Sequence, residues 1–281
     1  MAVVPRDAQD VDVSKITFGD VMVLDNGGKI VYIQYDGGTL YIRGPKLKLP
    51  FDTKFFVKDG SLDDTGKYNI KGNFVDMAEG SKDRIFHDKM IEFDEMLKTA
   101  AKERSVEWFR KKNMSAEVID TIFTDTIKVS IDPKTGEPNG RYPPSFTFKI
   151  KKKQGNIDLP CYDSTRMETV KVEDKKTGII VEKHQPPQYN INDPEGDDYA
   201  KIDDLLKKGT TLRGLVKCDF VWLGDAKLGC TWIAEQLQMS VPKGFNEYAF
   251  DDSDDETSPA ELNTENFIES SDEDGVARPA N

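Results

Sequence analysis

Histidine and cysteine are scarce in this sequence, and their scarcity excludes several kinds of chemistry. The 281 residues include two histidines, His87 and His184, and three cysteines, Cys161, Cys218 and Cys230. No Cys-x-x-Cys, His-Glu-x-x-His or His-x-Glu spacing occurs, so the common metal and hydrolase motifs are missing. A zinc site built from the three cysteines and His184 is conceivable, but structural zinc sites almost always use closely spaced ligand pairs. We therefore expect buried, reduced thiols, no cofactor and no enzymatic activity.

Long apolar runs are also missing. No stretch approaches the roughly 20 apolar residues that cross a bilayer, and the first residues have no apolar run of signal-peptide length. No Gly-x-Gly-x-x-Gly or Walker-type string occurs, so the pairs Gly27-Gly28 and Gly37-Gly38 indicate turns rather than phosphate loops. We expect an intracellular protein that is neither secreted nor attached to a membrane.

Acidic residues are abundant but unevenly distributed. The formal net charge is −12, yet residues 246–281 hold twelve Asp and Glu against one cation, Arg278. Residues 1–245 hold 38 Lys and Arg against 39 Asp and Glu, so this part is almost neutral and rich in lysine. An acidic segment attached to such a body could screen its cationic surface. This arrangement favours a protein that handles nucleic acid.

Turn signals between short apolar runs predict antiparallel strands. Asn26-Gly27 and Asp36-Gly37 separate strands expected at 20–24, 29–35 and 39–43, which together predict a three-stranded meander. By the same reasoning, we expect further strands at 51–57, 67–74 and 145–153, and hairpins that join 169–172 to 179–183 and 212–223 to 228–241.

Helical periodicity interrupts this β pattern. Apolar residues at spacings of three and four predict a helix over 83–104, and Ser115 can cap a second helix over 118–123. A third short helix is expected at 197–208. We therefore predict a mostly β (α+β) protein with three parts. These are an N-terminal arm (1–14), an antiparallel barrel or sandwich domain (15–245) with a helical insertion at about 83–125, and an acidic tail (246–281) expected to be disordered.

A basic strand offers the first candidate binding residues. In Ser145–Lys153, alternation places Phe146, Phe148 and Ile150 on one face, where they are expected to fill the core, and lysines on the other. Proteins that bind single strands combine a cationic groove with aromatic platforms for the bases. An ordinary solvated strand face is the alternative. We expect Tyr142 to stack on bases and the following cations to hold phosphates: Arg141, Lys149, Lys151, Lys152 and Lys153.

The last predicted hairpin supplies two more candidates. If residues 224–227 form its turn, alternation places Lys217 and Trp232 on one face, with Asp219 and Cys230, and places Phe220 and Trp222 on the other. We expect Phe220 and Trp222 in the core, Trp232 as a stacking residue and Lys217 as a further phosphate contact. Core packing is the alternative for Trp232, because large aromatic side chains are usually mostly buried. Trp108 is expected to pack against a helix.

The acidic tail contains the candidate residues for self-screening. Serines precede acidic runs at Ser253 and at Ser270-Ser271, and phosphorylation there would increase the negative charge. Without modification the tail would act as a solubilising segment. The carboxylates expected to screen the binding groove are Asp251, Asp252, Asp254, Asp255, Glu256, Asp272, Glu273 and Asp274.

As an ordered set, several segments resemble a known family. The set comprises Lys29–Gly37 (KIVYIQYDG), Trp108-Phe109, Ser115–Ile119, Thr135–Pro144 (TGEPNGRYPP), Val221–Trp232 (VWLGDAKLGCTW) and the acidic tail. Together they resemble the podovirus-type single-stranded DNA-binding proteins, in the version carried by giant and algal DNA viruses. The resemblance covers roughly residues 20–281.

This resemblance implies an OB-fold barrel that binds single-stranded DNA during viral replication and recombination, in the host cytoplasm or nucleus. It also implies that the acidic tail occupies the empty DNA groove and recruits a DNA polymerase, a helicase or a primase. Family tails commonly end in an aromatic residue, whereas here Phe250 and Phe267 lie inside the tail, so Phe267 is the candidate docking residue. A homodimer is compatible with this interpretation.

Two other classes of function compete with DNA binding. An acidic-tailed interaction or virion protein would bind basic proteins, but it should carry acid over its whole surface, whereas this body is lysine-rich. A nuclease or hydrolase would need a carboxylate cluster around a metal, and the sequence indicates none. We therefore predict a sequence-tolerant single-stranded DNA-binding protein.

Overall fold

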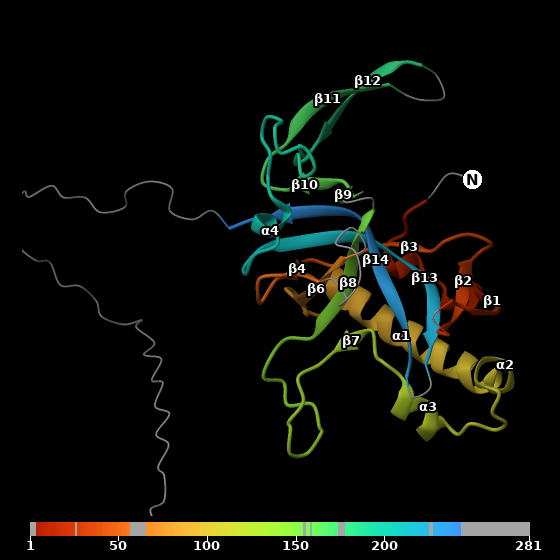
Figure 1. Ribbon diagram of the computed structural model, residues 1–281. Helices are drawn as coiled ribbons and strands as arrows, with labels where there is room; N and C mark the ends of the chain where they lie inside the picture. The colour runs from red at the N-terminus through yellow and green to blue at the C-terminus, as the bar shows by residue number, and fades with distance from the viewer. Residues whose placement is uncertain are drawn as a thin grey trace, which may run out of the picture. The chain divides into compact units, whose positions relative to one another are not determined.

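The computed structural model describes residues 4–25, 27–56, 66–153, 156–157, 159–173, 178–224 and 227–242 (Figure 1). The acidic tail and its candidate residues lie outside this part of the chain. In the described part, no helix is long and apolar enough to cross a membrane.

The helices are α1 (Lys82–Glu103), α2 (Ser105–Phe109), α3 (Ala116–Ile122) and α4 (Ile202–Leu205), with short 3-10 turns at Ala8–Asp10 and Val13–Lys15. The strands are β1 (Ile16–Val23), β2 (Lys29–Tyr35), β3 (Tyr41–Arg43), β4 (Leu47–Lys48), β5 (Phe55–Phe56), β6 (Lys67–Phe74), β7 (Ile127–Lys128), β8 (Ser145–Lys153), β9 (Asn156–Ile157), β10 (Cys161–Asp163), β11 (Glu168–Glu173), β12 (Ile180–Gln185), β13 (Thr211–Leu223) and β14 (Leu228–Ser240).

Five strands close into a barrel. β13 pairs with β4, β4 with β6, and β6 with β8, all antiparallel. β8 then pairs in parallel with β14, and β14 pairs antiparallel with β13, which returns the ring to its start. Helices lie beside the strands, and the β11–β12 hairpin projects away from the ring (Figure 1). The fold is therefore mostly β, with a barrel of the OB type.

Two predicted elements are wrong in detail. β1 and β2 pair as expected, but β3 pairs with β13 and not with β2. β2 already uses its second edge for the end of β13, so no edge remains for β3 to complete a meander. The third predicted helix shortens to α4, because Asp198 adopts a left-handed conformation with φ 54° and ends any helix that begins at 197.

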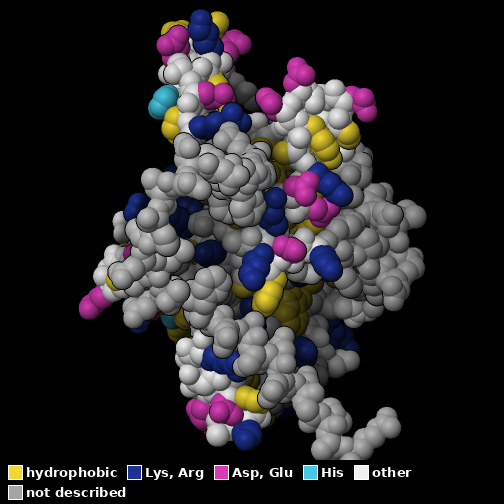
Figure 2. Space-filling view, turned by 90° about the vertical axis from the view of Figure 1, so that its left-hand side faces the viewer, with side chains coloured by type: hydrophobic (Ala, Val, Ile, Leu, Met, Phe, Trp, Pro, Cys, Tyr) yellow, Lys and Arg dark blue, Asp and Glu magenta, His cyan; other side chains and the backbone are white. Residues whose placement is uncertain are grey.

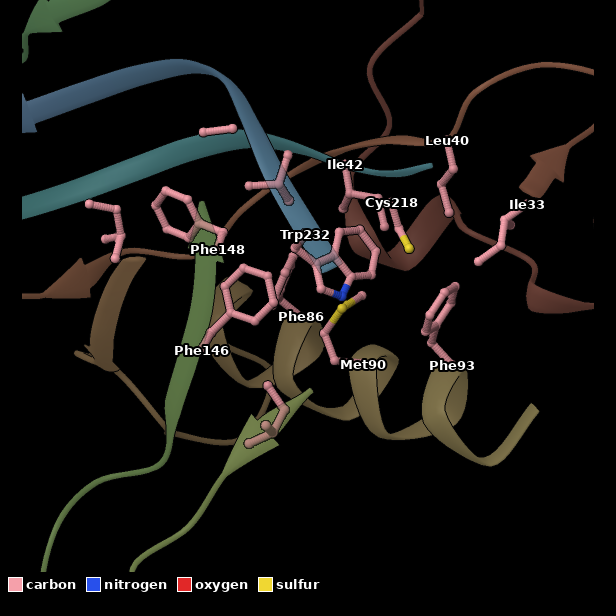
Figure 3. Close-up of a cluster of buried hydrophobic side chains, with 14 of the residues drawn as sticks. Ile33, Leu40, Ile42, Phe86, Met90, Phe93, Phe146, Phe148, Cys218 and Trp232 are labelled. Atoms are coloured by element: carbon pink, nitrogen blue, oxygen red, sulfur yellow. The ribbon is translucent and has the colours of Figure 1, made fainter. Parts of the chain in front are cut away.

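The barrel core is filled from β8 and α1. Phe146, Phe148 and Ile150 are buried, as the alternation of β8 predicts. The apolar stripe of α1 meets them: the Phe86 ring lies 5.1 Å from the Phe146 ring in an edge-on arrangement. Figure 3 shows Phe86, Met90 and Phe93 pointing from α1 towards the same cluster. Burial of this stripe, rather than helix propensity alone, holds α1 on the barrel.

A buried carboxylate couples α1 to β7. Asp94 accepts hydrogen bonds from the backbone N–H of Thr126 at 2.7 Å and from the Thr126 hydroxyl at 2.6 Å. Burial raises the pKa of Asp94 to about 6, although these hydrogen bonds lower it. The folded protein therefore holds a proton on Asp94 at pH values where the unfolded chain has lost it.

This raised pKa predicts a pH-dependent stability. Between pH 3.8 and about 6 the folded state binds the extra proton, so the contribution of Asp94 to stability decreases as the pH rises through this window. The expected change is on the order of 3 kcal/mol. Asp94→Asn should remove it, which urea unfolding of both proteins from pH 4 to 7 would measure as a change in their difference. Equal pH profiles for the two proteins would contradict the prediction.

Candidate nucleic-acid interface

A single row of cross-strand partners crosses the outer face of the barrel. Asn69 on β6 lies opposite Lys149 on β8, and Lys149 lies opposite Ile233 on β14. Ile233 in turn lies opposite Lys217 on β13, and Lys217 lies opposite Tyr41 on β3. Neighbouring strands are about 4.8 Å apart, so this row extends for roughly 19 Å. It places Lys149 and Lys217, two of the predicted phosphate contacts, on one face of the sheet, with the buried Ile233 between them.

Four lysines lie at the β6–β8 end of this row. Lys67, Lys71, Lys149 and Lys151 project outward from β6 and β8, and we call these four the lysine face. Lys67 lies directly opposite Lys151, a like-charge pair that is unfavourable unless an anion or solvent compensates it. Among the described residues, no carboxylate lies within ion-pair distance of any of the four. Figure 2 shows Lys and Arg side chains over the middle of one face of the molecule, with Asp and Glu side chains among them.

Lys149 is the most enclosed member of the lysine face. Its ammonium group donates a hydrogen bond of 3.2 Å to the Thr231 hydroxyl on β14. Burial lowers the pKa of Lys149, and the positive charges of Lys67 and Lys151 lower it further. A phosphate beside these three amines would stabilise the charged form of Lys149. The electrostatics of the lysine face therefore favour an anionic ligand.

Lys217 is already engaged by two carboxylates. Its ammonium group lies 3.0 Å from Glu235 and 3.3 Å from Asp219. Burial alone would lower the pKa of Lys217, but these two carboxylates outweigh that effect and raise it. The ammonium group also lies 5.9 Å from the centre of the Tyr41 ring. Since its charge is compensated within the protein, Lys217 is a weaker phosphate contact than the sequence predicts.

Aromatic side chains continue the surface beyond Lys217. Tyr32, Tyr41, Phe220 and Trp222 lie on the outer side of β2, β3 and β13, and we call them the aromatic strip. Tyr32 is 45% exposed, and its ring stands edge-on to Phe220 at 6.3 Å. A hollow of about 350 Å³ opens beside these two rings. Trp222 lies over Gly229, where a Cβ atom would come within 2.6 Å of the indole ring. The glycine therefore gives the indole room to lie against β14.

The two tryptophans of the hairpin exchange their predicted places. Trp232 is only 2% exposed and sits inside the barrel among Phe93, Phe146 and Cys218, so its assignment as a stacking residue is wrong (Figure 3). Trp222 was expected in the core but lies half-buried on the outer face, outside the core cluster.

A β-bulge explains why the position of Lys217 predicted the wrong faces for these tryptophans. The register of β13 with β14 shifts between Cys218 and Val221, so that two residues of β13 face one residue of β14. The extra residue reverses the alternation, because the side chains of a strand change face at every position. Lys217 therefore moves to the face of Phe220 and Trp222, while Cys218 turns inward beside Trp232. Trp108, in contrast, is a buried packing residue on α2, and its ring lies 5.3 Å from that of Phe18 on β1.

Arg141 and Tyr142 lie in the loop before β8. Tyr142 is 57% exposed, and the guanidinium group of Arg141 stands 5.3 Å from the centre of its ring. Ser130 anchors the loop, because its hydroxyl accepts a hydrogen bond from the Tyr142 backbone at 3.1 Å. No hydrogen bond or ring contact links this pair to the lysine face in the described part of the chain. The side chains of Lys152 and Lys153 lie outside the described residues, so their predicted role stays a prediction.

Sequence reasoning missed two sets of residues. Lys67 and Lys71 alternate with the buried Tyr68 and Ile70, a pattern that marks the outer face of a strand and could have identified them. Tyr32 likewise alternates with Val31 and Ile33 on β2. For Phe220 and Trp222 the alternation was visible in the sequence. The bulge that moves Lys217 to their face of β13 was not.

The chain matches no known family by sequence, and a solved structure resembles it at low sequence identity. No model of a known protein family matches the chain, and no curated protein matches its sequence. Among solved structures, the crystal structure of gp2.5, a single-stranded DNA binding protein encoded by bacteriophage T7, is similar to this chain, with a TM-score of 0.40 and 11% sequence identity. The similarity covers 79% of this chain and 100% of that chain. A TM-score of this size does not assign a function to this chain.

Proposed function

We propose that this protein binds single-stranded DNA without sequence preference and has no enzymatic activity of its own. The observation that carries the proposal is the cross-strand row, which leads from the lysine face to the aromatic strip on one outer surface. Cations that follow the phosphates and aromatic rings that stack on bases are the two components of single-strand binding. The setting in viral DNA replication or recombination follows from the sequence resemblance.

The lysine face and the aromatic strip have different roles in this proposal. The lysine face holds phosphates of any sequence, because charge carries no sequence information. Tyr32, Phe220 and Trp222 offer rings to unstacked bases, each worth about 1–3 kcal/mol. Duplex DNA keeps its bases stacked and paired, so it can use only the lysines. Preference for single strands therefore depends on the aromatic strip.

The direct test is fluorescence anisotropy with labelled oligonucleotides, single-stranded and double-stranded, over a salt series. We expect tighter binding of the single strand at every salt concentration. The logarithm of its affinity should fall with the logarithm of salt at a slope of about −0.7 per phosphate contacted. Equal affinity for both forms, or binding only to basic proteins, would refute single-strand binding.

We further propose that the acidic tail competes with DNA for the lysine face. The support is its composition, twelve carboxylates against one cation, beside lysines that have no described carboxylate partner. Phe267, within the tail, is proposed to dock a polymerase, a helicase or a primase.

Truncation after Phe245 is expected to tighten single-strand binding several-fold at low salt, because a competing polyanion is removed. The gain should shrink as salt rises, since screening weakens both interactions. Anisotropy on both proteins measures it. The matched control is a full-length chain with the tail carboxylates changed to amides, which should behave like the truncated protein. Unchanged affinity after truncation would exclude screening by the tail.

A further inference from the structure

A second hollow lies on the outer face of β13 and β14. It is on the N-terminal side of Lys217 along β13, whereas Phe220 and Trp222 of the aromatic strip are on the C-terminal side. It has a volume of about 420 Å³, within the range of sites that hold small organic ligands. We call it the arginine pocket. Its polar side chains are those of Arg43, Tyr162, Gln185, Arg213, Gln236 and Gln238.

Five strands line the arginine pocket: β3, β10, β13, β14 and, through Gln185, β12. Its floor consists of outward-facing partners on β13 and β14: Arg213 lies opposite Gln238, and Leu215 lies opposite Gln236. Arg43 on β3, the partner of Leu215, forms one wall. Tyr162 on β10 forms the other, opposite Gln238. Because these residues belong to paired strands, the pocket is held rigidly.

A close backbone contact brings the Arg43 wall against the floor. The N–H of Gly44 donates a hydrogen bond of 2.7 Å to the carbonyl oxygen of Gly214. A Cβ atom on Gly44 would lie only 2.8 Å from that oxygen, so a larger residue would push the wall away. Arg43 and Arg213 are the residues directly before Gly44 and Gly214, so this backbone hydrogen bond holds the two arginines close together.

The pocket carries positive charge that the protein leaves largely uncompensated. Arg213 donates a hydrogen bond of 3.4 Å to the carbonyl oxygen of Gly44, and no described carboxylate lies within ion-pair distance of it. Arg43 faces Asp7 at 3.4 Å, but both side chains are about half exposed, and such pairs contribute little. The pocket therefore suits an anion.

Amide groups surround these cations. Gln185, Gln236 and Gln238 line the hollow, and none of the three makes a side-chain hydrogen bond to another residue in the described ranges. Each amide offers both donors and an acceptor, the combination that reads the edge of a base. Guanidinium groups match phosphate oxygens in a two-bond geometry. Phosphate and base recognition therefore occur together in one pocket.

We propose that the arginine pocket binds one nucleotide of the strand that crosses the lysine face. This inference rests on the proposed function. Leu215 lines the pocket, and Lys217 follows two residues later on the same face of β13, a distance of roughly 7 Å. A strand that follows the cross-strand row to Lys217 thus reaches the pocket. The phosphate binds between Arg43 and Arg213, and the glutamine amides contact the edge of the base.

The proposal predicts a dependence on strand length. Oligonucleotides of about 4 and about 16 nucleotides represent the ends of the usual site-size range. Arg213→Ala in the full-length protein should weaken the longer strand about tenfold, because one charge-assisted contact is lost, and should change the shorter one less than twofold. Arg213→Lys, which keeps the charge but not the planar fork, should give an intermediate loss. A thermal melt of each variant verifies folding.

Lys149→Ala separates this inference from the proposed function, since it should weaken both lengths. If Lys149→Ala weakens binding while Arg213→Ala leaves the longer strand unchanged, the arginine pocket is not part of the path and only this inference fails. If Lys149→Ala has no effect while Arg213→Ala does, the lysine face fails and the pocket stands alone.

A separate experiment distinguishes a pocket for one nucleotide of a strand from a pocket for a free nucleotide. Deoxynucleoside monophosphates are titrated into the ¹⁵N-labelled protein while the side-chain amide signals of Gln236 and Gln238 are followed. Weak shifts at millimolar ligand that disappear in Arg213→Ala support a pocket for one nucleotide of a strand. Binding of a free monophosphate as tight as that of the longer oligonucleotide would overturn the proposal in favour of a small-molecule site, and an absence of shifts would overturn it altogether.

Discussion

Replacement of Trp232 by alanine is expected to lower the free energy of unfolding by about 3–5 kcal/mol, because it leaves a large cavity in the barrel core. The indole ring lies 5.3 Å from Phe93 and 6.0 Å from Phe146, so both rings lose a packing partner. Its buried N–H has no hydrogen-bond partner among the residues that the structure describes, so Trp232→Phe should be much milder than Trp232→Ala. Urea unfolding of the three proteins measures these differences.

Trp222→Ala provides the contrast on the same hairpin. Because Trp222 lies outside the core cluster, its loss should lower stability less than Trp232→Ala does and should weaken single-strand binding by the value of one stacked base, about 5- to 150-fold. Tyr199→Ala, at an exposed aromatic residue away from the row, is the matched control and should retain full affinity. A Trp232→Ala protein that folds normally but fails to bind would reverse the assignment of the two tryptophans.

Removal of two lysines should also weaken single-strand binding strongly. The double variant Lys149→Ala/Lys151→Ala is expected to weaken single-strand affinity by about 10- to 100-fold at low salt, because each lysine supplies a charge-assisted phosphate contact. With four contacts the salt slope is about −3, and with two it is about −1.4. Anisotropy from 50 to 200 mM salt resolves the change in slope.

A matched double variant controls for net charge. Lys111 and Lys112 are adjacent and exposed in the loop after α2, away from the row. Lys111→Ala/Lys112→Ala removes the same charge and should leave affinity and slope close to those of the parent protein. If both double variants lose affinity equally, only the total charge matters and the lysine face is not a binding site.

The sequence predicts the barrel strands well where periodicity is strong. The bounds of β2, β6 and β8 agree with the expected ranges, and the outward position of Lys149 and Lys151 follows from the alternation of β8. α1 was predictable for the same reason, because its apolar stripe repeats over its whole length. These are local patterns, and each is set by the residues of one element.

What the sequence did not predict depends on pairing between distant segments. β3 pairs with β13, which follows it by about 170 residues, so no local pattern indicates this pairing. Lys217 carries the expected charge, but Glu235, one of the two carboxylates that compensate this charge, comes from the neighbouring strand β14. The arginine pocket combines residues from five strands, so no local pattern marks it.

The bulge in β13 also makes this hairpin tolerant of one deletion. Cys218 and Val221 both face the interior, and Asp219 and Phe220 together lie opposite the single residue Thr231. Loss of Asp219 or Phe220 would leave one residue between Cys218 and Val221, which is the spacing of a regular strand, so Lys217 would keep its outward position and Cys218 its inward one. Homologous sequences that share this barrel should therefore accept a single-residue gap at this point.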